Sequence, residues 1–486
     1  NFEEESPGNS SNLTSGKTTS STPTNTAVTP REAAINLANC IMGAGALSLP
    51  AFFKSCGAVL GVGLLLASCA WTWCSAVMMV KAADVVSMRV LRGAPVSSYE
   101  ELMDLTLGRN GRWLSTIGIL LLQIGCLVGY ANILADVVSP FAIDVLPPGL
   151  EPNRAAVLTT VSLGAMLPIG IAVGGDGGSQ SLAAVSKASI VIVGIFACVL
   201  TWCGMVKSIE VGASEHLVGG VISGAGVGGL SAGTAGALSH AQHANSLTLV
   251  NFGSAMSVLP LAIFAFGAHP AILPVTRAMQ PSGLKPSINV ITIVLRLCAV
   301  GYLMIGLGGY SSFRKHTAGN ILRNTDGQML GSFGSKLLKF GYGLVILASV
   351  PTILLPLQKS AKDAYLALLP LIVPPVRSGG GMVGTPVKPN TSGGDDTSVP
   401  PEVANRLATV VAVVSMTAAL CLSLYVPNVA FAFGLTGSTC SFLIAFVLPA
   451  ASFLSVTSGG GANKVMTMST KKKQHAIEMN ARSNGG

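Results

Sequence analysis

Long apolar runs, separated by shorter polar stretches, repeat along the whole chain. Most runs contain about the 20 residues that an α-helix needs to cross a bilayer core. In lipid a helix satisfies its own backbone hydrogen bonds, so runs of this length predict membrane-spanning helices. The predicted spans are residues 33–54, 57–82, 113–138, 155–175, 182–206, 250–276, 287–309, 335–357, 404–426 and 428–455.

The polar stretches divide the chain into a membrane domain, 31–455, and two tails. Residues 1–30 are rich in Ser, Thr and Asn, which predicts a disordered cytosolic N-terminal tail. The polar residues 456–486 predict a disordered cytosolic C-terminal tail. Within the membrane domain, the Gly-rich segment 207–249 predicts a long, mobile external loop, and 377–403 a flexible internal linker.

The positions of Lys and Arg predict the orientation in the membrane. With the N-terminus inside, loops 83–112, 277–286 and 358–403 and the C-terminal tail are cytosolic. They then hold about three times as many Lys and Arg as the external loops, which favours this orientation. Loop 310–334 is the exception, because it places Arg314, Lys315 and Arg323 outside.

The composition agrees with a membrane protein and excludes other classes. The chain is 50% hydrophobic and 10% charged, whereas soluble domains carry roughly 25% charged residues. The net charge of +9 is spread over short loops and forms no basic helix face, so no nucleic-acid partner is predicted. The ten cysteines form no CxxC pair or Cys/His cluster, so no metal centre or cofactor is predicted beyond a coupling ion. The spans hold no cluster of His, Asp or Glu typical of an enzyme.

The first predicted span is interrupted by Gly43, Gly45 and Pro50. Such residues leave backbone groups without helical partners, which a membrane tolerates only where protein, water or ligand satisfies them. The N–H groups at the start of a half-helix suit a carboxylate, and the carbonyls that end the preceding half-helix suit Na⁺. Alternatively, the two glycines only allow close packing and Pro50 only kinks the helix. This span by itself leaves both interpretations open.

The sixth predicted span has a similar interruption, Phe264-Ala-Phe266-Gly267-Ala-His269-Pro270. Paired interruptions at corresponding positions of two five-span halves indicate a transport site. His269 is ionisable within or near the membrane and is therefore a functional candidate, although it is equally consistent with a satisfied histidine at a helix end.

Other polar side chains within the spans are weaker signals. Asn39, which shares a helix face with Asn36, offers an amide oxygen that suits an alkali cation. Ser349 and Thr352 flank another proline and offer hydroxyl oxygens. All of these groups can instead join helices by hydrogen bonding. Arg296 in the seventh span must face protein or water, but the sequence does not predict its partner.

Five stretches of the chain together resemble the amino acid/auxin permease family, and most closely its branch of sodium-coupled neutral amino acid transporters. The resemblance covers most of residues 31–455 and is far more specific than any single motif. The stretches are 36–50 around Asn39 and Gly43, 98–112, 265–274 around His269, 350–360, and 425–449.

The resemblance implies an all-α polytopic membrane protein with the five-plus-five inverted repeat of the bacterial leucine transporter. It also implies alternating access around a midplane site between spans one and six, and sodium binding by Asn39 and Ser349. Ser349 replaces a frequent Thr and keeps the oxygen ligand, so Na⁺ and H⁺ both stay open as coupling ions. The family's usual eleventh span is missing and the chain starts at Asn1. Either the core survives without that helix, which the inverted repeat does not need, or the sequence is a fragment or comes from a truncated or frame-shifted gene.

We therefore predict a secondary active transporter of neutral or small amino acids, coupled to Na⁺ or H⁺, in the plasma, vacuolar or lysosomal membrane. Besides its substrate, the predicted partner is the lipid bilayer; the oligomeric state and the exact substrate are not predicted. The alternative is an amino-acid sensor that signals through its cytosolic tail. Predicted substrate-binding residues are Asn39, Gly43, Ala44, Gly45, Phe264, Phe266, Gly267 and His269; predicted ion-binding residues are Asn39, Ser349 and Thr352.

Overall fold

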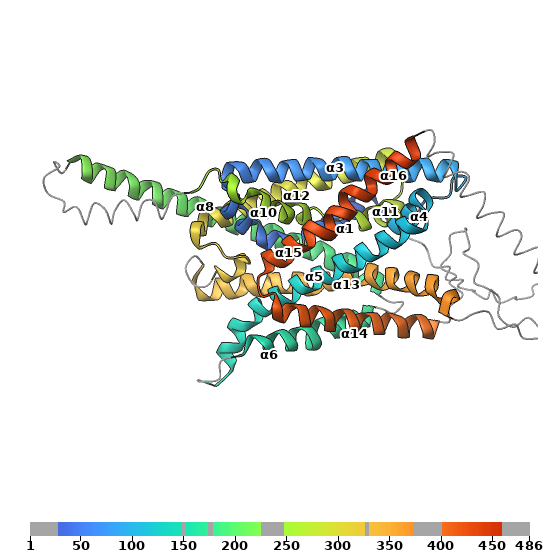
Figure 1. Ribbon diagram of the computed structural model, residues 1–486. Helices are drawn as coiled ribbons and strands as arrows, with labels where there is room; N and C mark the ends of the chain where they lie inside the picture. The colour runs from blue at the N-terminus through green and yellow to red at the C-terminus, as the bar shows by residue number, and fades with distance from the viewer. Residues whose placement is uncertain are drawn as a thin grey trace, which may run out of the picture.

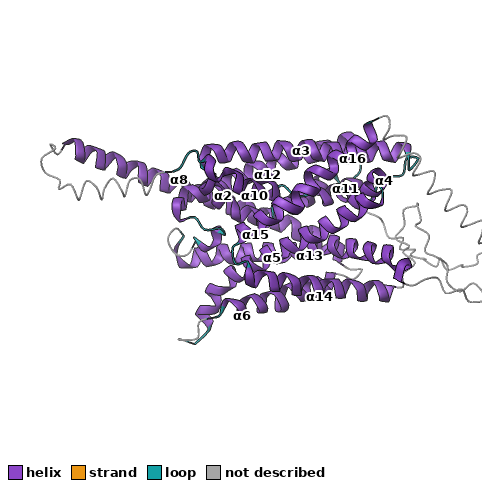
Figure 2. Ribbon diagram, viewed as in Figure 1, coloured by secondary structure: helices purple, strands orange, loops and turns teal. Residues whose placement is uncertain are grey.

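The computed structural model describes residues 28–147, 152–173, 178–224, 247–325, 330–372 and 401–458. Within these ranges the structure is helical, and its one extended pairing is an isolated bridge between Val28 and Met279. The long helices lie side by side along a common direction (Figures 1 and 2). Most of both predicted tails and of the linker 377–403, including the tail on which the sensor alternative depends, lies outside the described residues.

Spans one to five form the first half of the bundle. The first consists of α1 (Pro30–Ile41), a 3₁₀ turn η1 (Ala44–Ser48) and α2 (Leu49–Cys56), and the second is α3 (Ala58–Arg89). A short helix α4 (Tyr99–Leu107) precedes the third span, α5 (Arg109–Val145). The fourth consists of α6 (Arg154–Thr159), a π-helical segment η2 (Thr160–Met166) and α7 (Leu167–Val173), and the fifth is α8 (Gly178–Gly224).

Spans six to ten form the second half. The sixth consists of α10 (Phe252–Ala265) and α11 (His269–Ala278), and the seventh is α12 (Leu284–Phe313). Two 3₁₀ turns, η3 (Arg314–His316) and η4 (Ile321–Arg323), lead to the eighth, α13 (Gly331–Ile372). The ninth is α14 (Pro401–Tyr425), and the tenth consists of α15 (Val429–Thr436), π-helical segments η5 (Gly437–Ser441) and η6 (Leu443–Val447), and α16 (Leu448–Thr457).

These helices confirm the predicted number of spans. Within the described ranges, 9 helical segments are long and apolar enough to cross a membrane. The pair α1 and η1–α2, bent by 43° at its break, makes a tenth. The protein is thus a multi-pass membrane protein.

The contacts between spans repeat in the two halves with the order exchanged. α1 lies against α11 and α2 against α10, so each part of one broken helix meets the opposite part of the other. α5 packs on α13, and α3 packs on α12. The contact of α8 with α12, which joins span five to span seven, has its counterpart in the contact of α16 with α3, which joins span ten to span two. A two-fold axis in the membrane plane produces this exchange, which agrees with the predicted five-plus-five inverted repeat.

The fifth span is longer than predicted. α8 continues to Gly224, so the prediction of a loop from residue 207 onward is wrong for 207–224. The prediction gave too much weight to glycine, whereas this stretch also contains Ile, Val and Ala, and Lys207 forms an i,i+3 ion pair with Glu210 at 3.2 Å. The rest of the predicted loop, 225–246, lies outside the described residues.

Glycine allows some helices to meet backbone to backbone. A Cβ atom on Gly204 of α8 would lie 2.6 Å from the carbonyl oxygen of Gly308 on α12, and one on Gly308 would lie 2.7 Å from the nitrogen of Thr201. The Thr201 hydroxyl also donates to the carbonyl of Met304 across this contact, at 3.2 Å. The α8–α12 contact is therefore of the small-residue type that packs helices in lipid.

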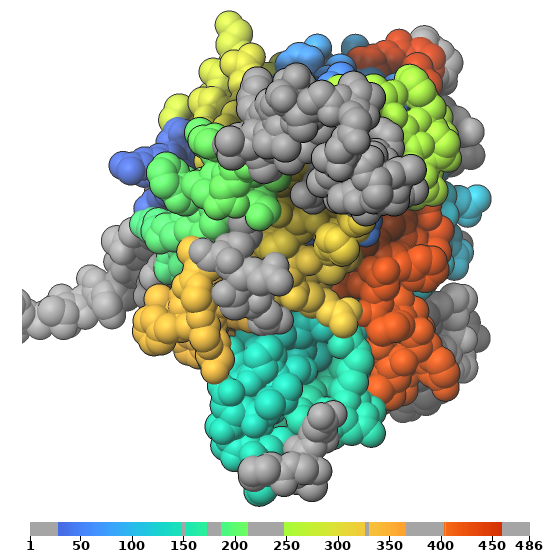
Figure 3. Space-filling view, turned by 90° about the vertical axis from the view of Figure 1, so that its left-hand side faces the viewer, coloured from blue at the N-terminus to red at the C-terminus, as the bar shows by residue number. Residues whose placement is uncertain are grey.

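Polar contacts join the spans at the end of the bundle where α3 begins, which the loop charges predict to be external. Asp136 of α5 accepts from Arg154 of α6 at 2.9 Å and from Asn320 of the α12–α13 loop at 2.9 Å. Lys54 of α2 donates to the carbonyl of Thr317 in the same loop at 2.9 Å. Figure 3, viewed from this end, shows the loop in gold at the centre of the face. The loop therefore connects the first broken helix to α5.

Candidate substrate site between two broken helices

The first break exposes backbone donors. α1 ends at Ile41 and η1 begins at Ala44, and the N–H groups of Ala44 and Gly45 have no hydrogen-bond partner among the described residues. Such groups carry the partial positive charge of a helix N-terminus, which favours an anion. A Cβ atom on Gly45 would lie 3.4 Å from Cα of Ala265, in van der Waals contact, so the two breaks lie directly against each other.

The second break presents carbonyls and bulky side chains. α10 ends at Ala265, and α11 starts at His269. Between them, the N–H of Gly267 donates to the backbone carbonyl of Phe264 at 3.0 Å, and the N–H of Ala268 donates to the backbone carbonyl of Phe266 at 2.9 Å. These donors are therefore already used within the break, unlike those of Ala44 and Gly45.

Tyr302 of α12 connects the two breaks. Its hydroxyl lies 2.5 Å from the carbonyl oxygen of Ile41 and 2.7 Å from that of Ala265, and its side chain is fully buried. Both carbonyls end a half-helix and carry partial negative charge. The hydroxyl has a single proton, so it donates to one carbonyl at a time. The sequence predicted that the carbonyls at the ends of the half-helices would bind a cation or an ammonium group. The structure instead places the Tyr302 hydroxyl next to these carbonyls.

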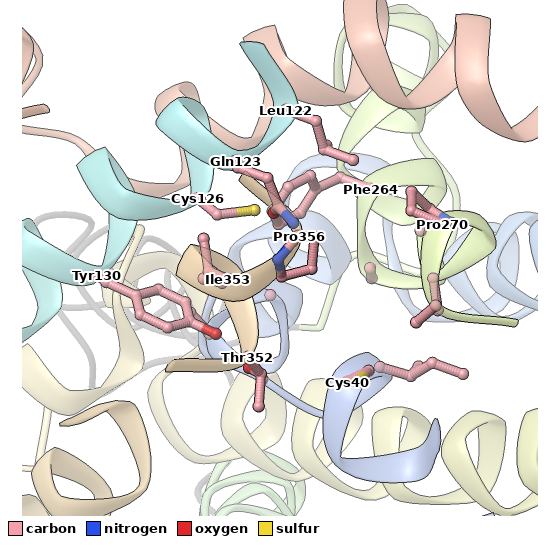
Figure 4. Close-up of a pocket in the computed structure, with 18 residues that line it drawn as sticks. Cys40, Leu122, Gln123, Cys126, Tyr130, Phe264, Pro270, Thr352, Ile353 and Pro356 are labelled. Atoms are coloured by element: carbon pink, nitrogen blue, oxygen red, sulfur yellow. The ribbon is translucent and has the colours of Figure 1, made fainter. Parts of the chain in front are cut away.

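A cavity of about 90 Å³ lies beside the breaks (Figure 4). Figure 4 shows Gln123, Cys126 and Tyr130 projecting from α5 towards Thr352 and Ile353 of α13. The remaining walls come from the end of α1, from η1, and from both sides of the second break. The cavity therefore extends from the breaks towards the end of the bundle that the loop charges predict to be cytosolic.

Aromatic side chains fill the opposite side of the breaks. Phe264 stacks on Phe433 of α15 with ring centroids 4.5 Å apart and planes 14° apart. Further out, Phe52 of α2 and Ile321 and Leu322 of the α12–α13 loop are fully buried. The site is thus closed towards the predicted external end.

The cavity brings together only part of the predicted site. The predicted residues that line it are Gly43, Ala44, Gly45, Phe264, Gly267 and Thr352. The predicted residues that do not line it are Asn39, Phe266, His269 and Ser349.

Of the predicted ion ligands, Thr352 lines the cavity, whereas Asn39 and Ser349 lie in the layer around it. The amide nitrogen of Asn39 donates to the hydroxyl of Ser186 on α8 at 3.2 Å, and its amide oxygen takes no part in that bond. The Ser349 hydroxyl donates to the carbonyl of Val345 at 2.8 Å. The hydroxyl of Thr352 donates to the Ser349 carbonyl at 2.6 Å. Each of these hydroxyl oxygens keeps lone pairs that a cation can use.

His269 and Phe266 are fully buried. Phe266 packs its ring against Tyr302, with centroids 5.1 Å apart. Neither ring nitrogen of His269 has a hydrogen-bond partner in the described part of the chain. The hydroxyl of Ser441 on η5 also lacks one, and it lies 3.6 Å from where a Cβ atom on Gly267 would be. Buried polar groups normally find partners, so this side of the second break keeps unused polar groups.

Three tyrosines of the site were missed by the sequence analysis. Tyr130 lies with its hydroxyl 3.0 Å from the position of a Cβ atom on Gly43, and the Tyr342 hydroxyl donates to the carbonyl of Gly43 at 3.2 Å. Tyr302 is the third. Each is an amphipathic residue inside an apolar run, and a buried tyrosine hydroxyl usually finds a partner. The sequence therefore indicated that these tyrosine hydroxyls form hydrogen bonds, but it did not indicate which groups accept them.

Two broken helices that cross at a small cavity in mid-bundle are typical of secondary transporters. The sequence profile of the family described as "Transmembrane amino acid transporter protein" matches residues 26–459. The chain belongs to this family. The family consists of transporters and not enzymes, as the sequence predicted.

Several proteins of known description are similar over most of the chain. "Solute carrier family 38 member 10" of Homo sapiens is 24% identical over 419 residues, which are 85% of this chain and 31% of that protein. The chain therefore spans less than a third of that relative's length. "Amino acid transporter AVT6B" of Arabidopsis thaliana is 24% identical over 436 residues, 87% of this chain and 81% of that protein.

Among solved structures, a Na⁺-coupled sialic acid symporter in a substrate-bound, outward-open state is 12% identical, with a TM-score of 0.41. The similarity covers 83% of this chain and 79% of that one.

Proposed function

We propose that the protein is a secondary active transporter of small, neutral amino acids, coupled to Na⁺ or H⁺. One observation carries the proposal: Ala44 and Gly45, whose N–H groups have no partner among the described residues, line a cavity that the end of α10 also lines. A carboxylate and an ammonium group on one carbon fit this pairing of donors with nearby acceptors.

The substrate carboxylate binds the N–H groups of η1, and its ammonium group binds carbonyls at the second break, around Phe264–Gly267. The side chain then lies against Phe264, Cys126 and Ile353, which are part of the lining. The described lining residues include no Asp, Glu, Lys or Arg, which favours an uncharged side chain. A cavity of about 90 Å³ is below the ~300 Å³ at which drug-sized pockets begin, which favours a small one.

The coupling cation binds next to the substrate, between the amide oxygen of Asn39 and the hydroxyl groups of Ser349 and Thr352. Hard oxygen ligands of this kind suit an alkali cation. Spans one, two, six and seven then rock against the rest of the bundle. This motion separates Phe264 from Phe433 and opens the site to the external end.

Uptake by the full chain in proteoliposomes tests the proposal. Labelled glycine, alanine, serine, leucine, glutamate and lysine are offered with an imposed Na⁺ gradient, with an imposed pH gradient, or with neither. We expect glycine, alanine and serine to accumulate above equilibrium with one of the two gradients. Uptake that reaches only equilibrium under every gradient contradicts coupling, and preferred uptake of glutamate or lysine contradicts the proposed substrate class.

A further inference from the structure

A groove of about 480 Å³ runs along the outer surface of the bundle between α3 and α12. Its walls are mostly apolar and include Leu66 on α3 and Leu303 on α12. Neighbouring side chains on α12 are strongly exposed: Ile293 is 53% and Leu297 is 61% accessible. An exposed apolar surface of this kind on a membrane protein faces lipid. The groove therefore opens into the bilayer.

Arg296 lines this groove and is exposed. The sequence predicted that its charge faces protein or water, whereas the structure places it on the lipid side of α12. It has no hydrogen bond or ion pair among the described residues. The other polar groups of the lining are satisfied: the indole N–H of Trp73 donates to the hydroxyl of Thr292 at 2.8 Å, and the Cys69 thiol donates to the carbonyl of Leu295 at 3.6 Å.

The position of Arg296 along α12 favours one leaflet. The 30 residues of α12 extend about 45 Å, and Arg296 lies about 4 Å from the middle, on the side of Leu284. Helix side chains lean towards the N-terminus, so the guanidinium extends towards the Leu284 end. The loop charges predict that this end is cytosolic, and anionic lipids are enriched in the cytosolic leaflet. An arginine at this depth reaches polar groups by extending along the helix and by thinning the bilayer locally.

We propose that the α3–α12 groove binds one anionic phospholipid of the cytosolic leaflet. Its phosphate accepts hydrogen bonds from the Arg296 guanidinium, whose planar set of donors matches phosphate oxygens. One acyl chain lies in the groove, towards Leu66 and Leu303. A zwitterionic lipid such as phosphatidylcholine fits less well, because its headgroup is net neutral, whereas the headgroup of phosphatidylserine keeps a net negative charge through its carboxylate. A second copy of the chain bound by this same face would bring two Arg296 side chains together.

Native mass spectrometry of the purified chain tests this site. Phosphatidylserine, phosphatidylcholine and oleate are added separately, and the number of retained molecules is counted. We expect one phosphatidylserine per chain, retained in preference to phosphatidylcholine. Arg296→Gln is expected to lower the retained fraction about fivefold, the effect of one basic residue at a membrane surface. The matched control is Arg89→Gln, because Arg89 is exposed at the end of the same groove helix, α3, but outside the groove.

Two further variants decide the outcome if Arg296→Gln does not fold, as judged by size-exclusion chromatography and thermal melting. Ala70→Phe fills the groove from an exposed position on α3 and keeps the charge; it is expected to lower retention as well. Arg296→Lys keeps the charge without the paired donors and is expected to retain an intermediate fraction.

Equal retention of phosphatidylserine by the wild type and by Arg296→Gln or Ala70→Phe overturns the proposal. Equal retention of phosphatidylcholine and phosphatidylserine overturns it too, as does binding of oleate alone, which identifies a fatty-acid site. A dimer that disappears in Arg296→Gln shows instead that the groove is an interface between copies. Amino acid uptake is measured separately, so failure of this lipid site leaves the proposed transport activity untouched.

Discussion

The two broken helices are equivalent in the repeat, but they offer the site different chemistry. The first break, Met42–Gly43, is followed by the small residues of η1, and the N–H groups of Ala44 and Gly45 have no partner among the described residues. The second break uses its N–H groups internally and is flanked by Phe264 and Phe266. In the proposed site the first break therefore provides donors, and the second provides acceptors and shape. We expect such a site, built from two copies of one architecture, to hold an asymmetric molecule in a single orientation.

The largest expected effect comes from blocking the donors of the first break. Gly45→Val places methyl groups against Ala265 and Phe264 and pushes the breaks apart, since even a Cβ atom would lie 3.4 Å from Cα of Ala265. We expect uptake in proteoliposomes to fall about 100-fold, as misplacing a site by about 1 Å can do. Gly63→Val is the control, because a Cβ atom on Gly63 meets nothing within 4 Å. Similar losses in both variants contradict a special role for Gly45.

The second break is expected to set the size of the substrate. Phe264→Ala removes a cavity wall and the stacking on Phe433. We expect the ratio of leucine to alanine uptake to rise about 20-fold, within the 10–200-fold range for small changes in an apolar pocket. The competing rates are measured in one proteoliposome preparation. Phe431→Ala, at a 59% exposed position of α15, is the control. An unchanged ratio shows that Phe264 does not select the substrate.

The link between the breaks is expected to matter next. Tyr302→Phe keeps the packing on Phe266 but removes the hydroxyl donor from the Ala265 carbonyl, whereas the Ile41 carbonyl keeps its bond from the N–H of Gly43 at 2.8 Å. A buried acceptor without a partner costs about 1–3 kcal/mol, so we expect about a tenfold loss of uptake and a lower melting temperature. Tyr342→Phe removes a single, longer bond of 3.2 Å to Gly43 and should cost less. The reverse order contradicts a bridging role for Tyr302.

A smaller effect is expected for the ion. Ser349→Ala removes an oxygen from the proposed cation site, and we expect the concentration of Na⁺ or H⁺ that gives half-maximal uptake to rise about fivefold, as loss of one hydrogen-bonding group typically allows. Ser349→Thr should restore the wild-type value. Ser415→Ala on α14, which loses a comparable bond within its own helix, at 3.1 Å to Ala412, is the control. A change in maximal rate without a change in ion dependence contradicts the ion role.

The smallest expected effect sharpens the comparison at His269. The sequence predicted substrate contact, but the structure buries this side chain outside the cavity lining. We therefore expect His269→Gln to change the KM for alanine by less than about threefold, because a direct charged hydrogen bond would be worth more than that. A tenfold rise in KM, with unchanged folding by size-exclusion chromatography, returns His269 to the substrate site.

The sequence predicts those parts of the site whose causes are local. Glycine and proline break a helix wherever they lie, so Gly43, Gly45 and Gly267 could be placed at the breaks before any packing was known. The spans follow from hydropathy for the same reason. The inverted repeat could be predicted only from the family resemblance. The exchanged contacts between spans agree with that repeat.

The remaining parts depend on distant residues. Tyr302 meets Ile41 across 261 positions of the chain, and Asn39 meets Ser186 across 147. No local pattern indicates that such residues come together. His269 lies outside the cavity lining, which the sequence could not show, because the direction of a side chain at the start of a half-helix depends on the helices around it. Arg296 was misplaced because the sequence alone does not show which face of α12 is covered.

The backbone contact between α8 and α12 has a mechanical consequence. A joint between Gly204 and Gly308 has no side chains, and therefore no rotamers that could rearrange to let one helix slide over the other. We therefore expect the two backbones at this contact either to stay together or to separate completely. Span five is then expected to move together with span seven, so that the rocking group of spans one, two, six and seven carries span five with it. Spin labels on these two helices should keep a constant separation while the site changes sides.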